Sequence, residues 1–248
     1  MLLPDETWAA IKPLFVAAFP DEAVVAVFDD GSFKQYENVH PEPQRTFAIS
    51  DADRAELMER EPALFLHTHP NGPAHPSDRD TEQQIATGWT WGVSVVTGNA
   101  AGEVLDVTYP EIWGPAAPVL PLEGRTYCWG VRDCWTLVTD YMRAQGRELP
   151  PIPRVRAPGA HHTDPAKVNQ FTHWAERLGF ERVPDRAQRR PGDVAVLQWA
   201  SPVANHVAVY LGESRYLHQP DKSLSSVWQV TQEERMLERM AVTFWRLP

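Results

Sequence analysis

The chain has 248 residues, 43% of them hydrophobic, and a formal net charge of -10. This length allows one large or two modest domains, and the hydrophobic content is ordinary for a protein that buries a core. The sequence has no apolar run near the roughly 20 residues that span a bilayer, no leader-like N-terminus and no lysine/arginine cluster. We therefore expect no membrane span, no signal peptide and no nucleic-acid partner.

The first half of the chain alternates helix-like and strand-like patterns around short turns. Helices are expected over 6–18, over 51–60 behind a Ser50 cap, and after Ser77; strands over 22–28, 32–38 (after an Asp30-Gly31 turn), 45–49, 63–66, 91–97 and 104–107. This order fits a small α/β domain built around one sheet.

Two histidines stand at the end of the apolar run 63–66. His67 and His69 are two residues apart, so on a strand they share a face and can point at one atom. Asp80 follows in the first turns of the next predicted helix. Three such ligands with one open position are typical of a catalytic zinc. Two simpler interpretations stay open: Ser77 and Asp80 form only a helix capping box, and the histidines are solvated.

The full string, His67-x-His69-x7-Ser77-x2-Asp80, resembles the motif of the JAMM/MPN metalloproteases. The resemblance implies that His67, His69 and Asp80 bind Zn²⁺ and that Ser77 supports an oxyanion. Such a site also needs a general base from an earlier strand. The segment around Glu22 resembles the family's Pro-x-Glu sequence, which makes Glu22 the candidate base, with the carboxylate of Asp21 beside it.

Residues 113–124 contain three prolines and two glycines, a composition that disfavours regular structure. We place a connector there, between a first domain over 1–112 and a second over 125–248.

The second half contains a helix pattern that opens near Cys134. A thiol at a helix N-terminus is shifted toward the thiolate by the helix dipole, although a buried structural cysteine is the commoner case. The chain has only one other cysteine, Cys128, so it holds no disulfide framework. Further along we expect a Pro-rich loop over 147–165, a helix over 165–178, a turn and strand over 190–197, and a hairpin over 205–218.

The hairpin carries His206 on one strand and His218 on the next. If its loop is the three residues 212–214, residue 208 faces residue 218, and the two histidines are diagonal neighbours on one face. A two-residue loop would instead place them on opposite faces.

Asp133-Cys134, the Pro-Gly-Asp turn at 191–193 and the two hairpin histidines together resemble the NlpC/P60 cysteine peptidases, which have a papain-like α+β fold. The resemblance implies that Cys134 is the nucleophile, His206 the base and His218 the group that orients it. Tyr127 matches a tyrosine that the family keeps near its active site. Cys128 matches nothing, and neither do His161 and His162, which we expect to be solvated.

A JAMM domain followed by an NlpC/P60 domain resembles the tail assembly proteins of long-tailed bacteriophages with lambda-type tail tips. This implies a virion protein that contacts other tail-tip proteins and cuts the stem peptides of host peptidoglycan during entry. The first domain would process a tail protein or dock the chain in the tip. One alternative is a structural docking protein with dispensable sites. The other is a cellular enzyme, either deubiquitinase-like or wall-remodelling. The expected lack of a signal peptide disfavours an exported wall-remodelling enzyme.

Overall fold

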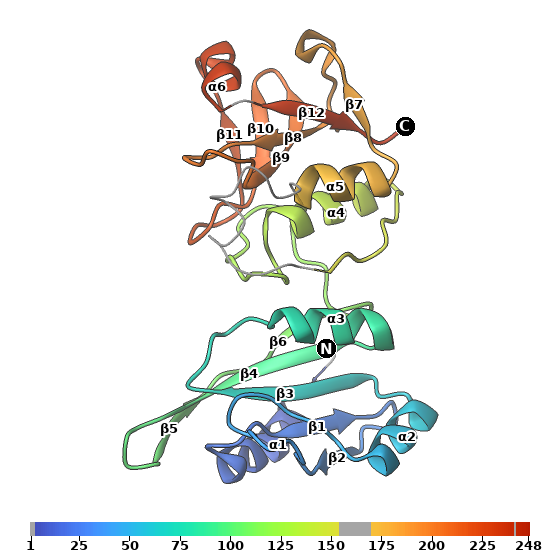
Figure 1. The fold of residues 1–248 in the computed structure, drawn as a ribbon, viewed down its shortest axis with the longest axis vertical. Helices are drawn as coiled ribbons and strands as arrows, with labels where there is room; N and C mark the ends of the chain where they lie inside the picture. The colour runs from blue at the N-terminus through green and yellow to red at the C-terminus, as the bar shows by residue number, and fades with distance from the viewer. Residues whose placement is uncertain (1–2, 154–169, 241) are drawn as a thin grey trace. The chain divides into compact units, whose positions relative to one another are not determined.

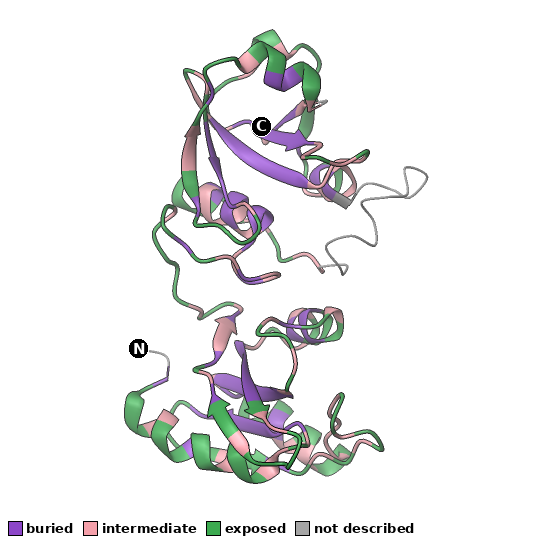
Figure 2. Ribbon diagram, turned by 90° about the vertical axis from the view of Figure 1, so that its left-hand side faces the viewer, coloured by how far each residue is buried: buried purple, intermediate pink, exposed green. Residues whose placement is uncertain are grey.

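The computed structural model describes residues 3–153, 170–240 and 242–248, and the chain divides into two compact units, Met1–Pro118 and Val119–Pro248 (Figure 1). The division falls inside the predicted connector. Within each unit the central strands are largely buried, the edge strands are more exposed, and the helices expose their outer faces (Figure 2). Among the described residues no helix is both long and apolar enough to cross a membrane.

The first unit is built on a mixed sheet with strand order β2-β1-β3-β4-β5, and β6 pairs with β4. Only β3 and β4 run parallel, and α3 connects them. Its elements are α1 (Asp5–Ala18), β1 (Val24–Val27), β2 (Phe33–Tyr36), α2 (Asp51–Arg60), β3 (Leu64–Pro70), α3 (Asp78–Thr87), β4 (Trp91–Gly98), β5 (Val104–Val107) and β6 (Glu111–Trp113). The predicted helices and most predicted strands of this half are confirmed, including the Ser50 cap.

The two faces of this sheet have different coverings. Helix α1 packs Ile11 and Phe15 on a cluster that includes Val25 and Leu66. On β3 this cluster includes Leu64 and Leu66. Because side chains alternate along a strand, Phe65 and His67 point to the opposite face. The alternation of side chains along β3 therefore places His67 and His69 away from α1, on the side where α3 begins.

The strand predicted over 45–49 is wrong: Arg45 lies in a turn, and residues 46–49 belong to no strand. Its backbone is held by Asn38 and Val39: the Asn38 amide donates to the carbonyl of Thr46 (3.2 Å) and accepts from the N–H of Ala48 (3.1 Å), and the Val39 N–H donates to the carbonyl of Ala48 (2.8 Å). This attachment lets the ring of Phe47 pack on His67. The predicted connector also begins later than expected, because β6 includes Trp113.

The second unit contains a six-stranded antiparallel sheet of order β11-β10-β9-β8-β12-β7. Helix α4 packs against β9. Its elements are α4 (Cys134–Ala144), α5 (Gln170–Arg177), β7 (Glu181–Val183), the 3₁₀ turn η1 (Arg186–Gln188), β8 (Val194–Leu197), β9 (His206–Gly212), β10 (Arg215–His218), β11 (Ser226–Gln229), α6 (Glu233–Arg239) and β12 (Thr243–Arg246). The start of the helix predicted over 165–178 lies outside the described residues, as do His161 and His162.

Candidate active sites

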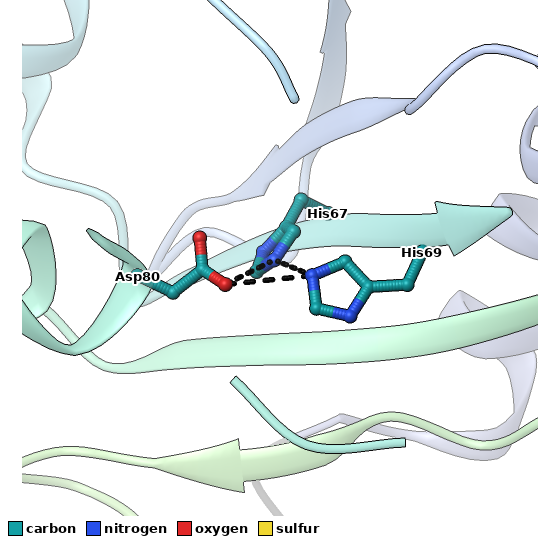
Figure 3. Close-up of side chains that lie close together, drawn as sticks. All are labelled: His67, His69 and Asp80. Atoms are coloured by element: carbon teal, nitrogen blue, oxygen red, sulfur yellow. Dashed lines mark hydrogen bonds and ion pairs between the residues drawn. The ribbon is translucent and has the colours of Figure 1, made fainter. Parts of the chain in front are cut away.

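Strand β3 and the first turn of α3 bring His67, His69 and Asp80 together (Figure 3). The Nε2 atoms of the two histidines are 3.2 Å apart, and each lies 3.4 Å from Oδ2 of Asp80. All three side chains are buried. The donor atoms therefore converge on one point, as the sequence period predicts.

The spacing of these three atoms fits a tetrahedral zinc site. Zinc bonds of about 2.0–2.1 Å at tetrahedral angles separate neighbouring ligand atoms by about 3.3–3.4 Å. The three observed separations are 3.2, 3.4 and 3.4 Å. Two imidazoles and one carboxylate are also the donor types that zinc prefers, and they leave one of four positions open.

The surrounding hydrogen bonds orient these donors. Nδ1 of His69 lies 2.9 Å from the carbonyl of Pro73, so this nitrogen is an N–H donor, and Nε2 is the ring nitrogen that faces the centre. The loop that follows β3 lies close to the His69 side chain, since a Cβ added at Gly72 would come within 2.9 Å of Cβ of His69. His67 is enclosed by the rings of Phe47 and Trp91, and its Nδ1 is buried without a hydrogen-bond partner.

Ser77 and Asp80 form the capping box of α3. The Ser77 N–H donates to Oδ2 of Asp80 (2.7 Å), and Oγ of Ser77 accepts from the Asp80 N–H (3.2 Å). The same Oδ2 faces both histidines. The capping interpretation and the ligand interpretation are thus compatible: the cap fixes the carboxylate that points at the centre.

The charges of these groups are coupled. Burial on its own would raise the pKa of Asp80, but the nearby His67 and hydrogen bonds from both histidines and Ser77 hold it well below its usual range. Burial would lower the pKa of His69, and its hydrogen bond with Asp80 turns this into a net rise. Asp80 is therefore an anionic donor at any physiological pH.

Glu22 lies beside this cluster. The β1–β3 register pairs Val24 with His67, and continuing it by two residues sets Glu22 opposite His69 on the same face. Burial raises the pKa of Glu22 to about 7, the charge of His69 lowers it and that of Asp80 raises it. Asp21 is only half-buried and lies in the bend before β1. A buried carboxyl with a pKa near neutrality is suited to general-base work.

In the second unit Cys134 is the first residue of α4 and is 8% exposed. Asp133 caps this helix: Oδ1 accepts from the Thr136 N–H (2.8 Å), and the Asp133 N–H donates to Oγ1 of Thr136 (3.1 Å). The predicted helix start is therefore confirmed, and the thiol lies where the free N–H groups and the helix dipole favour a thiolate.

The hairpin β9–β10 brings His206 and His218 together by a route that the sequence does not predict. Its loop is the two residues Glu213 and Ser214, both with positive φ (51° and 58°). A bulge at Arg215/Tyr216 then shifts the register, so that His218 pairs with Ala208. The expected diagonal arrangement is reached, and Nε2 of His206 lies 3.3 Å from Nδ1 of His218.

Both of these imidazoles are neutral near pH 7. Burial and, to a smaller extent, the neighbouring His218 lower the pKa of His206 to about 3, against the opposing charge of Asp133. Burial lowers the pKa of His218 to about 4. A neutral His206 that donates from Nε2 to Nδ1 of His218 keeps an unprotonated Nδ1, the form that accepts a proton.

Tyr127 and a hollow border the cysteine. Burial raises the pKa of Tyr127, as do the charges of Asp133 and Cys134, so its hydroxyl stays protonated near the thiol. A shallow hollow opens at Cys134 and is lined by Trp129, Asp133, Cys134, Trp135, Ile152, Phe171 and Trp174. Cys128 is buried in the loop before α4, where its backbone pairs with that of Arg132.

Sequence reasoning missed three residues that the structure places at the histidine pair. Asp133 acts electrostatically on His206, and the indoles of Trp199 and Trp228 contact the imidazoles. The Asp133-Cys134 pair was visible in the sequence, but its helix cap and its charge effect depend on the fold. The two tryptophans carried no signal beyond their type.

Comparison with known proteins finds a family match in the second unit and two relatives that align with most of the chain. Residues 124–246 match the model of the NlpC/P60 family. The chain is 27% identical to tail tip assembly protein K of Escherichia phage lambda over 192 residues, which cover 76% of this chain and 83% of that protein. It is 28% identical to tail tip assembly protein K of Escherichia phage N15 over 223 residues, 86% of this chain and 84% of that protein.

Two solved structures are also similar. A protein from Salinibacter ruber shares 23% identity over 46% of this chain and 80% of its own, with a TM-score of 0.29. An NlpC/P60 family protein from Bacillus cereus shares 13% identity over 95% and 67%, with a TM-score of 0.33. Scores of this size do not establish a shared fold. By its family match, the segment 124–246 of this chain is an NlpC/P60 domain.

Proposed function

We propose that this protein is a phage tail-tip peptidase whose Cys134–His206–His218 site hydrolyses peptide bonds of host peptidoglycan during entry. The observation that carries the proposal is the neutral His206–His218 pair, 3.3 Å apart, in an NlpC/P60 domain whose helix α4 begins at Cys134. The similarity to tail tip proteins of two phages supports a virion location, with other tail-tip proteins as partners.

The chemistry follows from the tautomer of His206. Nδ1 of His206 takes the thiol proton, and the sulfur of Cys134 attacks the scissile carbonyl to form a carbon–sulfur bond. The carbon–nitrogen bond then breaks, and the imidazolium gives its proton to the leaving amine. Water, deprotonated by the same nitrogen, releases the thioester and restores the thiol. His218 holds the Nε2–H of His206 throughout and so fixes the reactive tautomer.

The test of this function is digestion of purified peptidoglycan, with mass spectrometry of the soluble products. Peptide-bond cleavage predicts fragments with new amino and carboxyl termini in the stem peptide and an intact glycan. Products cut only in the glycan, or no products from tail-assembled protein, would contradict the assignment.

We further propose that the first unit is a JAMM/MPN-like zinc hydrolase with His67, His69 and Asp80 as ligands. The separations of 3.2–3.4 Å between the three donor atoms favour this second activity. A bound zinc ion would supply a Lewis acid and lower the pKa of water at its open position. Glu22 would accept a proton from that side of the site, and the Ser77 hydroxyl would donate to a developing oxyanion. Its substrate would be a protein of the assembling tail.

Metal analysis tests this second site. The wild-type chain is expected to hold one equivalent of zinc after dialysis at neutral pH, and His69→Ala none. Equal metal content in the two proteins would remove the ligand assignment, while a His40→Ala control, altered at a half-buried position outside the cluster, should match the wild type.

A further inference from the structure

The loop between β8 and β9 places an indole against both histidines of the second unit. The ring centroid of Trp199 lies 5.3 Å from that of His206 at an interplanar angle of 76°, and 5.6 Å from that of His218 at 31°. Trp228 on β11 stacks on the other histidine, His218, at 5.6 Å and 20°. The two indoles also meet each other, with centroids 5.4 Å apart.

This loop is fixed by one side chain next to the base. Oδ1 of Asn205 accepts from the Trp199 N–H (2.7 Å), and Nδ2 of Asn205 donates to the Trp199 carbonyl (2.9 Å). A single amide thus holds both backbone groups of Trp199, and the next residue along the chain is His206. The position of the indole is therefore coupled to the start of β9.

The contacts of Trp199 and Trp228 with the two imidazoles matter because the reactive tautomer of His206 depends on the orientation of both rings. The 3.3 Å contact joins Nε2 of His206 to Nδ1 of His218, and rotating either ring would break it. Edge-to-face and stacked aromatic contacts favour one ring orientation over others. Among the described residues, Trp199 is the one whose ring contacts both imidazoles.

We propose that Trp199, anchored by Asn205, is a positioning residue that keeps His206 and His218 oriented toward each other and shielded from water. Trp228 completes the enclosure on the His218 side. This role rests on the proposed function of the same site, but it concerns the imidazoles and can be measured without substrate.

The ionisable groups around the pair are few. Each histidine faces the other. The charge of Asp133, at the start of the helix that carries Cys134, also acts on the pKa of His206. His218 owes its low pKa to burial. Removing the indole admits water, so the pKa of His218 should rise toward the ordinary value of about 6.5.

The experiment is an NMR titration of the imidazole Cε1–H signals in full-length wild type, Trp199→Leu, Trp199→Phe and Asn205→Ala. We expect the His218 titration to move up by about one pH unit or more in Trp199→Leu and Asn205→Ala. Trp199→Phe, which keeps a ring, should remain near wild type. The matched control is Trp129→Ala: Trp129 is another half-buried indole beside Cys134, but its ring does not contact either histidine among the described residues. It should leave both titrations in place.

Unchanged titrations in Trp199→Leu and Asn205→Ala would overturn the proposal, and so would an equal shift in Trp129→Ala. If Trp199→Leu does not fold, the comparison of Asn205→Ala with Trp199→Phe decides. A shifted titration in a protein that leaves peptidoglycan intact would keep the positioning role and reject the proposed substrate.

Discussion

At the scale of single residues, environment decides which carboxyls and imidazoles can do chemistry. Glu22 and Asp80 are both buried beside His69, yet their pKa values move in opposite directions. Asp80 receives hydrogen bonds that hold it ionised, whereas no hydrogen bond offsets the burial of the Glu22 carboxyl in this way. This division predicts Asp80 as ligand and Glu22 as base.

Replacing the predicted base separates these two roles. Glu22→Gln keeps the size of the side chain but accepts no proton, so metal-dependent hydrolysis should fall by about 10²–10⁴-fold. Zinc content should stay at the wild-type level, because Glu22 is not a ligand. Asp21→Asn is the matched control and should retain activity. Persistent activity in Glu22→Gln would move the base elsewhere.

The two buried histidines of the second unit give a predictable pH dependence of stability. Their pKa values fall from 6.5 to about 3 and about 4 on folding. Below about pH 6.5 the unfolded chain therefore binds protons that the folded unit does not, and the free energy of unfolding falls as the pH drops toward about 4. We expect a loss of about 2 kcal/mol for each histidine, roughly 4 kcal/mol for the pair, at pH 5, measured by urea unfolding. A His206→Gln/His218→Gln variant should show a flatter profile; an identical slope would refute this origin.

At the scale of elements, the period-2 pattern of β3 predicted which residues meet at the first site, because alternation fixes the face of every side chain on a strand. The second site was less predictable. The bulge at Arg215/Tyr216 sets the His206–His218 pairing, and it depends on the turn at Glu213 and Ser214. The false strand over 45–49 reflects a tertiary attachment to Asn38. Four short strands were missed (β6, β7, β11 and β12), and each has only three or four residues.

The two serine caps of the first unit allow a matched comparison. Ser50 caps α2 as Ser77 caps α3, each accepting a backbone N–H three residues ahead at 3.1 and 3.2 Å. Replacing either serine by alanine should lower the free energy of unfolding by about 1 kcal/mol. Only Ser77→Ala should also lose metal-dependent hydrolysis, because its hydroxyl is beside the proposed ligand Asp80. Equal activity in the two variants would leave Ser77 with capping alone.

At the scale of the whole molecule, two units with separate cores carry two candidate sites of unrelated proposed chemistry. The proposed zinc ligands belong to the first unit, and the cysteine and its histidines belong to the second. A ligand that binds only the folded form stabilises the unit that holds it.

Zinc should therefore raise the stability of one unit selectively. At a free concentration about 100 times its Kd, it should add about 2.7 kcal/mol to the unfolding of the first unit. Hydrogen exchange, which resolves the two units, should show added protection within residues 1–118 and none within 119–248. His69→Ala should remove the effect, and protection confined to the second unit would contradict the placement of the metal.

The most direct test of the account compares the two cysteines in a peptidoglycan digestion assay. Both are buried in the second unit, but only Cys134 begins a helix. We predict that Cys134→Ala abolishes release of stem-peptide fragments, while Cys128→Ala retains most of the wild-type rate. Loss of activity in Cys128→Ala with retention in Cys134→Ala would contradict the assigned nucleophile, and full activity in both variants would reject a cysteine peptidase.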